Sequence, residues 1–171
     1  MSYLSIPISI TIMPQYFHLL FLLAITCLAC ESPQVPEAPA EEPNPAPVFH
    51  PTHEPKKVNA PFSDAVQVGN LFFLSGQIGM DHSTRTLVEG GIEAETRQCL
   101  ENIKAVLAQH ELEMKDVVKA LVVLDDIEDF AAFNAIYRTY LPQKPARTTF
   151  AAEALAAGAK IEIEVVAAAT E

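Results

Sequence analysis

Apolar and polar positions alternate in short blocks beyond residue 60, beginning with two apolar runs at residues 65–68 and 71–75. Gly69 and Asn70 separate the two runs, and both residue types accept the positive φ angles of a two-residue turn. This pattern predicts an antiparallel β-hairpin.

Two longer segments have the periodicity of amphipathic helices. Residues 92–109 place apolar side chains at every third or fourth position, with charged side chains between them. Residues 127–140 keep the same spacing, and Pro142 prevents this second helix from continuing. Cys99 lies on the apolar stripe of the first helix with no histidine near it in the sequence, so we interpret it as a core residue rather than a nucleophile.

Three further segments are predicted to be strands. Residues 117–124 are mainly Val and Leu, which is typical of a strand covered on both faces. Residues 147–152 and 160–169 follow the second helix, and the last segment alternates apolar and acidic positions. The predicted order is therefore β-β-α-β-α-β-β, an α+β fold with both helices on one face of the sheet.

The other face of this sheet needs a partner. Five strands at ~4.8 Å spacing make a sheet about 24 Å wide, and two helices of ~10 Å diameter cover only one of its faces. Leu71 and Phe73 point away from Phe72 and Leu74, so both faces are apolar. We predict that copies of the chain bury the uncovered face in a homo-oligomer; the same physics allows a different protein as the partner.

Residues 1–30 contain no Asp, Glu, Lys or Arg, and residues 19–29 form an apolar run. A run of about eleven residues is short of the ~20 that span a bilayer, so a removable signal is the better interpretation than a permanent membrane helix. Met13 could be the true start of such a signal.

The apolar run ends at Ala29 and Cys30, and this junction resembles a bacterial lipoprotein signal in which Cys30 becomes lipidated. The leucine that usually stands three places before the lipidated cysteine is replaced here by Cys27. The alternative is that both cysteines are apolar residues of an ordinary signal, or of an upstream stretch translated from a misassigned start.

Residues 31–57 contain eight prolines, which fix φ and remove backbone donors. We expect a disordered, extended linker that reaches at most ~3.1 Å per residue. His50 and His53 lie within it, and we interpret them as a solvated pair rather than as metal ligands. Residues 58–171 contain every periodic segment and form the predicted folded domain.

Charge and cysteine spacing narrow the possible functions. The chain has 22 Asp plus Glu against 11 Lys plus Arg, a formal charge of −11, and its longest basic run is Lys56-Lys57. Such a chain repels phosphate backbones, so we do not expect a nucleic-acid partner. The three cysteines lack the spacing of a structural zinc site, and we predict no metal.

Two charged residues stand inside extended apolar segments, Arg147 after Pro145-Ala146 and Glu162 in the last predicted strand. A guanidinium presents a planar fork that matches a carboxylate with two parallel hydrogen bonds. Arg147 is therefore a candidate clamp for a substrate carboxylate. An ion pair of Arg147 with Glu162 or Glu153 is the structural alternative, and the sequence leaves both open.

Across residues 58–171 the chain resembles the Rid (YjgF-like) family, the reactive intermediate deaminases. The resemblance depends on six motifs in the family's order: Ala60-Pro61-Phe62, Leu74-Ser75-Gly76-Gln77-Ile78, Arg97 to Lys104, Phe130 to Tyr137, Pro145-Ala146-Arg147 and Lys160-Ile161-Glu162-Ile163-Glu164.

The resemblance implies a homotrimer of chorismate-mutase-like subunits whose clefts hydrolyse 2-imino or 2-enamino acids to 2-keto acids and ammonia, with no cofactor. By the same resemblance Arg147 would bind the substrate carboxylate and Glu162 would orient the attacking water. The implied substrate-binding residues are Phe62, Ser75, Gly76, Asn134 and Thr149.

Two departures from the family pattern concern the implied site. Phe62 stands where many active members carry tyrosine, so a hydroxyl is missing. Thr148 and Thr149 stand where small residues or a cysteine are common, and Glu153 adds a charge nearby. These departures imply either an altered substrate preference or a loss of activity.

The signal predicts a deaminase of the bacterial cell envelope, in the periplasm, held at the membrane only through Cys30. The location is cytoplasmic if the N-terminal segment comes from a misassigned start. The alternative function is a non-catalytic binding protein for a keto acid or amino acid that uses Arg147 without turnover. A charge of −8 on residues 58–171 argues against a ribonuclease role, whereas a chaperone role stays open.

Overall fold

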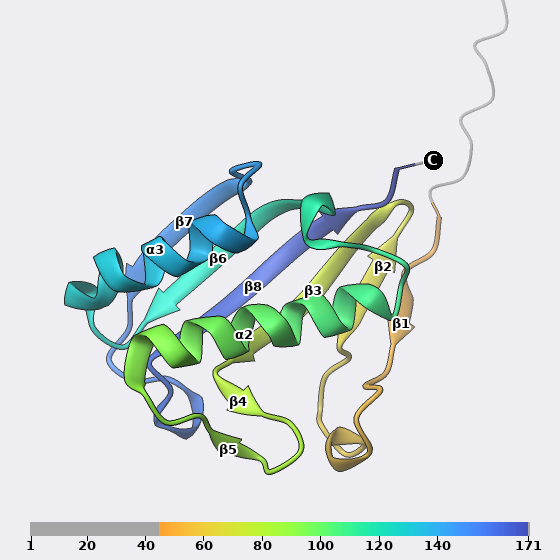
Figure 1. Cartoon of the computed structure of the whole chain (residues 1–171). Coiled ribbons are helices and arrows are strands. Elements are labelled where there is room, and N and C mark those ends of the chain that lie inside the picture. Colours follow the sequence, from red (N-terminus) through yellow and green to blue (C-terminus); the bar gives the residue numbers. More distant parts are fainter. Residues whose placement is uncertain (1–44, 171) are drawn as a thin grey trace, which may run out of the picture. The chain divides into compact units, whose positions relative to one another are not determined.

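The predicted turn at Gly69 and Asn70 joins two antiparallel strands in the computed structural model, which describes residues 45–170. Gly69 has a φ of 60°, a conformation that glycine adopts without steric cost. Figure 1 shows this hairpin within one sheet of order β1-β2-β3-β8-β6-β7, crossed on one side by two helices. The strands of the sheet are β1 (Val48–His50), β2 (Ala65–Val68), β3 (Leu71–Ile78), β6 (Val117–Leu124), β7 (Ala146–Ala151) and β8 (Ile161–Ala168). The helices are α2 (Gly91–Ala108) and α3 (Phe130–Tyr140).

The predicted order β-β-α-β-α-β-β is confirmed for the elements of this sheet and its helices from β2 to β8, and β1 adds a strand before them that the sequence pattern does not predict. Strand β7 runs parallel to β6, whereas the other pairs are antiparallel, so the sheet is mixed. Two short strands that the sequence pattern does not predict, β4 (Met80–Asp81) and β5 (Thr86–Leu87), form a separate hairpin between β3 and α2. A 3-10 turn at Ile127–Asp129 precedes α3, so the second helix begins three residues later than predicted.

The core lies between the sheet and the helices. Its largest fully buried side chains come from α2, α3, β6 and β8, among them Leu100, Ile103, Phe133, Val122 and Ile163. Cys99 is also fully buried, as predicted from its place on the apolar stripe of α2. Its Sγ donates to the carbonyl of Gln77 at 3.0 Å.

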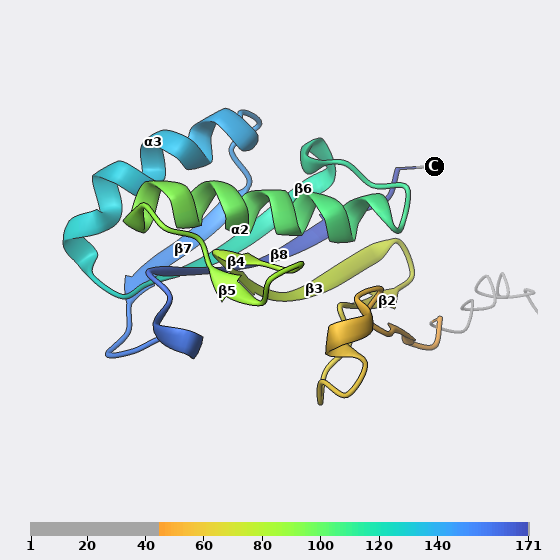
Figure 2. The same ribbon diagram turned by 60° about the horizontal axis from the view of Figure 1, so that its bottom comes forward.

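Both helices cover the same face of the sheet, as Figure 2 shows. On the other face Phe73 and Phe150 are 43 % and 46 % exposed, because their strands turn these side chains away from α2 and α3. The predicted uncovered apolar face is therefore present. Its burial by other copies of the chain stays a prediction.

The folded part begins at Val48 rather than at the predicted boundary of Val58. Residues 48–50 pair with β2, and His50 stacks on Phe72 with ring centroids 6.0 Å apart. The interpretation of His50 as a solvated linker residue is thus wrong, because sheet pairing with β2 overrides the proline-rich composition. His53 follows this strand and is exposed, and its Nδ1 contacts Asp64. The predicted signal of residues 1–30, the lipidation site Cys30 and residues 31–44 of the linker lie outside the described residues. No helix within residues 45–170 has the length and apolar character to cross a membrane.

Candidate functional site

Arg147 lies on β7, on the face that the helices cover. Its Nη1 donates to the side-chain oxygen of Asn134 on α3 at 2.8 Å. The guanidinium carbon also lies 4.6 Å from the ring centroid of Tyr137 and 5.3 Å from that of Phe133. A guanidinium over an aromatic face gains cation–π attraction, so α3 fixes the orientation of this side chain. The ion pair with Glu162 or Glu153 that the sequence leaves open is not formed within residues 45–170.

A cavity of about 390 Å³ opens beside this guanidinium, and we call it the Arg147 cavity. Its lining residues are Asn134, Tyr137, Arg138, Leu141, Lys144, Pro145 and Arg147. Three of these are basic, and none of the three forms an ion pair with a described residue. A concave site with unpaired positive charge suits a small carboxylate.

Tyr137 is a member of this cavity that the sequence analysis missed. Its hydroxyl is buried and has no hydrogen-bond partner in the part of the chain that the structure describes. Burial raises the pKa of Tyr137, and the Arg147 guanidinium opposes that rise. Asn134, Tyr137 and Arg138 stand three and four positions apart on α3, and this spacing is a signal that could have placed them on one stripe.

Glu162, Gly76, Ser75 and Phe62 line a second cavity of about 540 Å³, which we call the Glu162 cavity. A Cβ atom at Gly76 would lie 3.0 Å from Cδ of Glu162. Because Gly76 has no side chain, the Glu162 carboxylate can lie directly against its backbone. Burial raises the pKa of Glu162, and the neighbouring Glu164 carboxylate raises it further. A carboxyl group of this kind can accept a proton from water and return it.

An irregularity in β3 presents Ser75 and Gly76 to this cavity. The pairing of β3 with β8 shifts between Leu74 and Gln77, which leaves the two residues out of the regular ladder. The Ser75 hydroxyl donates to the carbonyl of Ser63 at 2.7 Å, and its backbone N–H donates to the carbonyl of Asp64 at 3.0 Å. The hydroxyl proton is thus engaged, and the oxygen can still accept a hydrogen bond from a ligand.

Arg147 and Glu162 do not meet within one chain. Arg147 pairs with the buried Ala120 on the helix side of the sheet, whereas Glu162 pairs with Val123 and points to the open side. From strand spacing and rise per residue, their Cα atoms lie about 14 Å apart across the sheet. The predicted site residues therefore fall into two groups: Asn134 joins Arg147, and Phe62, Ser75 and Gly76 join Glu162.

Thr149 does not line the Arg147 cavity. It pairs with Val122 on the helix side of the sheet, and its hydroxyl is buried without a hydrogen-bond partner among the described residues. The strand pairing provides a physical reason: residue 149 lies farther under the helices than residue 147.

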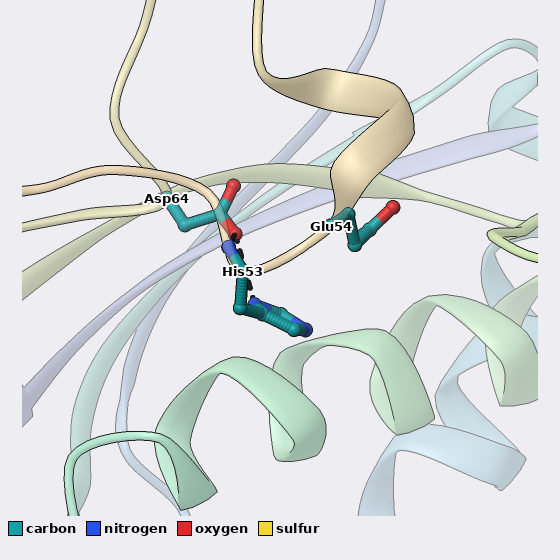
Figure 3. Close-up of side chains that lie close together, drawn as sticks. All are labelled: His53, Glu54 and Asp64. Atoms are coloured by element: carbon teal, nitrogen blue, oxygen red, sulfur yellow. Dashed lines mark hydrogen bonds and ion pairs between the residues drawn. The ribbon is translucent and has the colours of Figure 1, made fainter.

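Figure 3 shows His53, Glu54 and Asp64, whose ligand atoms lie within 4.8 Å of one another. His53 Nδ1 lies 3.1 Å from Oδ2 of Asp64. This is the set within residues 45–170 that could hold a metal ion. The Glu54 carboxylate already contacts the ammonium of Lys57 at 2.9 Å, however, so a cation would have to displace that partner.

The family model described as Endoribonuclease L-PSP matches residues 52–169. The chain belongs to this family. This L-PSP family protein is 41% identical over 117 residues to the RutC family protein PH0854 of Pyrococcus horikoshii, covering 68% of its own length and 93% of the relative. It is 44% identical over 108 residues to the human 2-iminobutanoate/2-iminopropanoate deaminase, with 63% and 79% covered.

Solved structures give the same result for the fold of the L-PSP family protein. It matches the YjgF gene product of E. coli with a TM-score of 0.66 and 31% identity, over 72% of this chain and 99% of the other. The resemblance to the Rid family that the six motifs carry is therefore confirmed, together with the α+β fold that it implies.

Proposed function

We propose that this protein hydrolyses 2-imino acids, and their enamine tautomers, to 2-keto acids and ammonia. The single observation that carries the proposal is the Arg147 cavity. One nitrogen of its guanidinium is held by Asn134, and the cavity contains two further basic side chains without a carboxylate partner among the described residues. The remaining N–H groups of Arg147 suit a substrate carboxylate.

In the proposed reaction the substrate carboxylate accepts hydrogen bonds from Arg147, and Glu162 accepts one from a water molecule. The water oxygen bonds to the imine carbon while Glu162 takes one of its protons and passes it to the imine nitrogen, which gives a carbinolamine. Glu162 then takes the hydroxyl proton of the carbinolamine as the C=O bond forms and passes it to the nitrogen, so the C–N bond breaks, ammonia leaves and Glu162 is ionised again. Positioning and one proton-moving carboxylate are sufficient for an already electrophilic carbon, and such a base contributes roughly 10²–10⁴-fold.

We further propose that two copies of the chain build each site within a homotrimer. This proposal is supported by the separation of Arg147 from Glu162 across the sheet and by the exposed Phe73 and Phe150 on the open face. Packing of the open faces would bury the apolar side chains. It would bring the Glu162 cavity of one copy toward the edge strand of the next.

The N-terminal predictions are a separate proposal. We propose that Cys30 is lipidated and that residues 31–47 tether the deaminase in the bacterial cell envelope. Palmitate labelling that depends on Cys30 and processing that is sensitive to globomycin test this location. Unprocessed protein without label contradicts it.

The activity is tested with the purified full chain and 2-iminobutyrate or 2-iminopropionate generated in situ. We expect keto acid release above the spontaneous rate, reduced at least about tenfold in Arg147→Ala because a charge-assisted pair is lost. Arg97→Ala, which removes an exposed arginine of α2 outside both cavities, is the matched control. Equal rates in wild type and Arg147→Ala would refute the proposal, and carboxylate binding without turnover would show a binding protein instead.

A further inference from the structure

Three basic side chains form one wall of the Glu162 cavity: Lys57, His82 and Arg85. They belong to two segments that are distant in the sequence, and they gather around the buried carboxylate of Glu54. Lys57 Nζ lies 2.9 Å and His82 Nδ1 2.5 Å from Oε1 of Glu54, and Arg85 Nη1 lies 3.9 Å from Oε2. We call these three residues the basic wall.

Arg85 is held in a costly conformation. Its backbone has a φ of 65°, in the left-handed region that favours glycine, and its N–H donates to the carbonyl of Asp81 at 2.8 Å to close the turn between β4 and β5. An arginine at such a position costs backbone energy that a glycine would not. Because the backbone of Arg85 closes the turn, its side chain is the part of the residue that could contact a ligand.

The guanidinium of Arg85 is also poorly paired. Its contact with Glu54 at 3.9 Å is longer than a hydrogen bond, and its side chain is 37 % exposed. The planar fork of donors is therefore available to an anion in the cavity.

The basic wall carries more positive charge than the Glu54 carboxylate that it surrounds, and Glu162 supplies the one carboxylate among the lining residues of the cavity. Lys57 and Arg85 carry two permanent charges against the single charge of Glu54. His82 places a ring nitrogen 2.5 Å from the same carboxylate and is left out of this count of charges. Local positive charge in a chain with a formal charge of −11 would concentrate an anionic ligand at this wall.

We infer that the basic wall binds a second carboxylate of the substrate, so that the preferred substrates are 2-imino acids with an acidic side chain. The inference rests on the proposed function, in which Arg147 takes the carboxylate next to the imine carbon. Glu162 and the basic wall line the same cavity of about 540 Å³, a size that suits small ligands. A side-chain carboxylate would thus reach Arg85 and Lys57 while water attacks beside Glu162.

The test compares two pairs of substrates on the full chain. The imines of alanine and 2-aminobutyrate carry one carboxylate, and those of aspartate and glutamate carry two; matched amino acid oxidases generate them in the presence of catalase. We expect a ratio of kcat/KM between the dicarboxylic and monocarboxylic imines of about 10 to 100, the effect of one charge-assisted pair. Arg85→Gly should lower this ratio by about tenfold or more, mainly through KM.

Arg85→Gly suits the test because glycine fits the left-handed backbone, so loss of the fold does not explain a change. Lys104→Gln removes the same charge from an exposed position of α2 outside the cavity and is expected to leave the ratio unchanged. A ratio near one in wild type that Arg85→Gly does not move, with the monocarboxylic imines still hydrolysed, overturns the inference and leaves the proposed function intact.

Absence of turnover for every imine would instead refute the proposed function. Calorimetric binding of 2-ketoglutarate and of pyruvate then tests the basic wall directly. Tighter binding of 2-ketoglutarate that is lost in Arg85→Gly supports a dicarboxylate site. Equal binding of both keto acids, unchanged in the variant, shows that the three basic side chains are only counter-ions of Glu54.

Discussion

Asn134 and Arg147 are joined by a hydrogen bond of 2.8 Å that links helix α3 to the edge strand β7. The bond occupies one nitrogen of the guanidinium. The ring of Tyr137 lies beneath the guanidinium and fixes the direction in which the remaining N–H donors point. A free arginine side chain has many rotamers, and this pair of contacts selects one of them. Asn134 is therefore a positioning residue for Arg147.

Asn134→Ala should raise KM for an imino acid by about 5- to 15-fold and change kcat little, because a lost hydrogen bond to a charged group costs about 1–1.5 kcal/mol. In the proposed reaction Arg147 holds a carboxylate that keeps its charge throughout, so the loss would affect substrate binding and the transition state equally. Michaelis–Menten kinetics on 2-iminobutyrate check this. A fall in kcat at constant KM would contradict the positioning role.

The pH dependence of activity should report Glu162. Its folded pKa lies above the ordinary 4.5, because burial and then the Glu164 carboxylate disfavour the charged form. In the proposed reaction the carboxylate form activates water, so activity should be present above this pKa and be lost as the pH falls through it. The acid limb of the profile is expected above pH 4.5.

Glu164→Gln should move that limb to lower pH, because removal of the like charge makes Glu162 easier to ionise. Profiles of kcat/KM for wild type and variant measure the shift. Glu93→Gln, on the exposed side of α2, is the matched control and should leave the limb in place. A limb that stays fixed in Glu164→Gln would show that another group controls the profile.

Gly76→Ala should displace the Glu162 carboxylate, because the new Cβ would overlap it. We expect kcat to fall by about 10²-fold or more, since a base moved out of reach loses its contribution. In a Glu162→Gln background the same glycine change should have little further effect, as residues that act as one unit are not additive. Additive losses of kcat in the double variant would show that Gly76 acts independently of Glu162.

Two inactive variants should restore activity when they are mixed. If each site takes Arg147 from one copy and Glu162 from its neighbour, subunit exchange between Arg147→Ala and Glu162→Gln proteins gives about one quarter of sites with both native residues. Keto acid release after mixing and reassembly measures this. No recovery, with exchange verified by mass, would indicate a site within one chain.

Phe73→Asp should dissociate the proposed homotrimer, because it would bury a charge in the proposed interface. Light scattering should show a smaller mass, and activity should be lost with it. Lys104→Asp on the outer side of α2 controls for the new charge. A variant that keeps the mass and the activity of the wild type would show that the open face is not the interface between copies of the chain.

Strong periodicity made the central elements predictable. Strand β6 matches the predicted residues 117–124, because its apolar run has no competing interpretation. Strand β1 was not predicted, because its three residues lie between prolines and are too few to show an alternation of apolar and polar positions. Pairing with β2 stabilises this strand where the local conformational preference does not. The hairpin of β4 and β5 was not predicted for the same reason, because strands of two residues are defined by the strands with which they pair.

The candidate site was predictable residue by residue but not as an arrangement. The spacing of motifs identified Arg147 and Glu162, yet their positions on opposite faces depend on the register of β6 with both neighbours. Lys57 and Arg85 could not be connected from the sequence. A buried carboxylate, Glu54, brings them together only in three dimensions.

Cys99 has a consequence for how the protein tolerates oxidants. Burial raises the pKa of this thiol, so the reactive thiolate is essentially absent and peroxide has no access to the sulfur. A domain whose described cysteine is inert is expected to keep this part of its core unmodified under oxidants that attack exposed thiols.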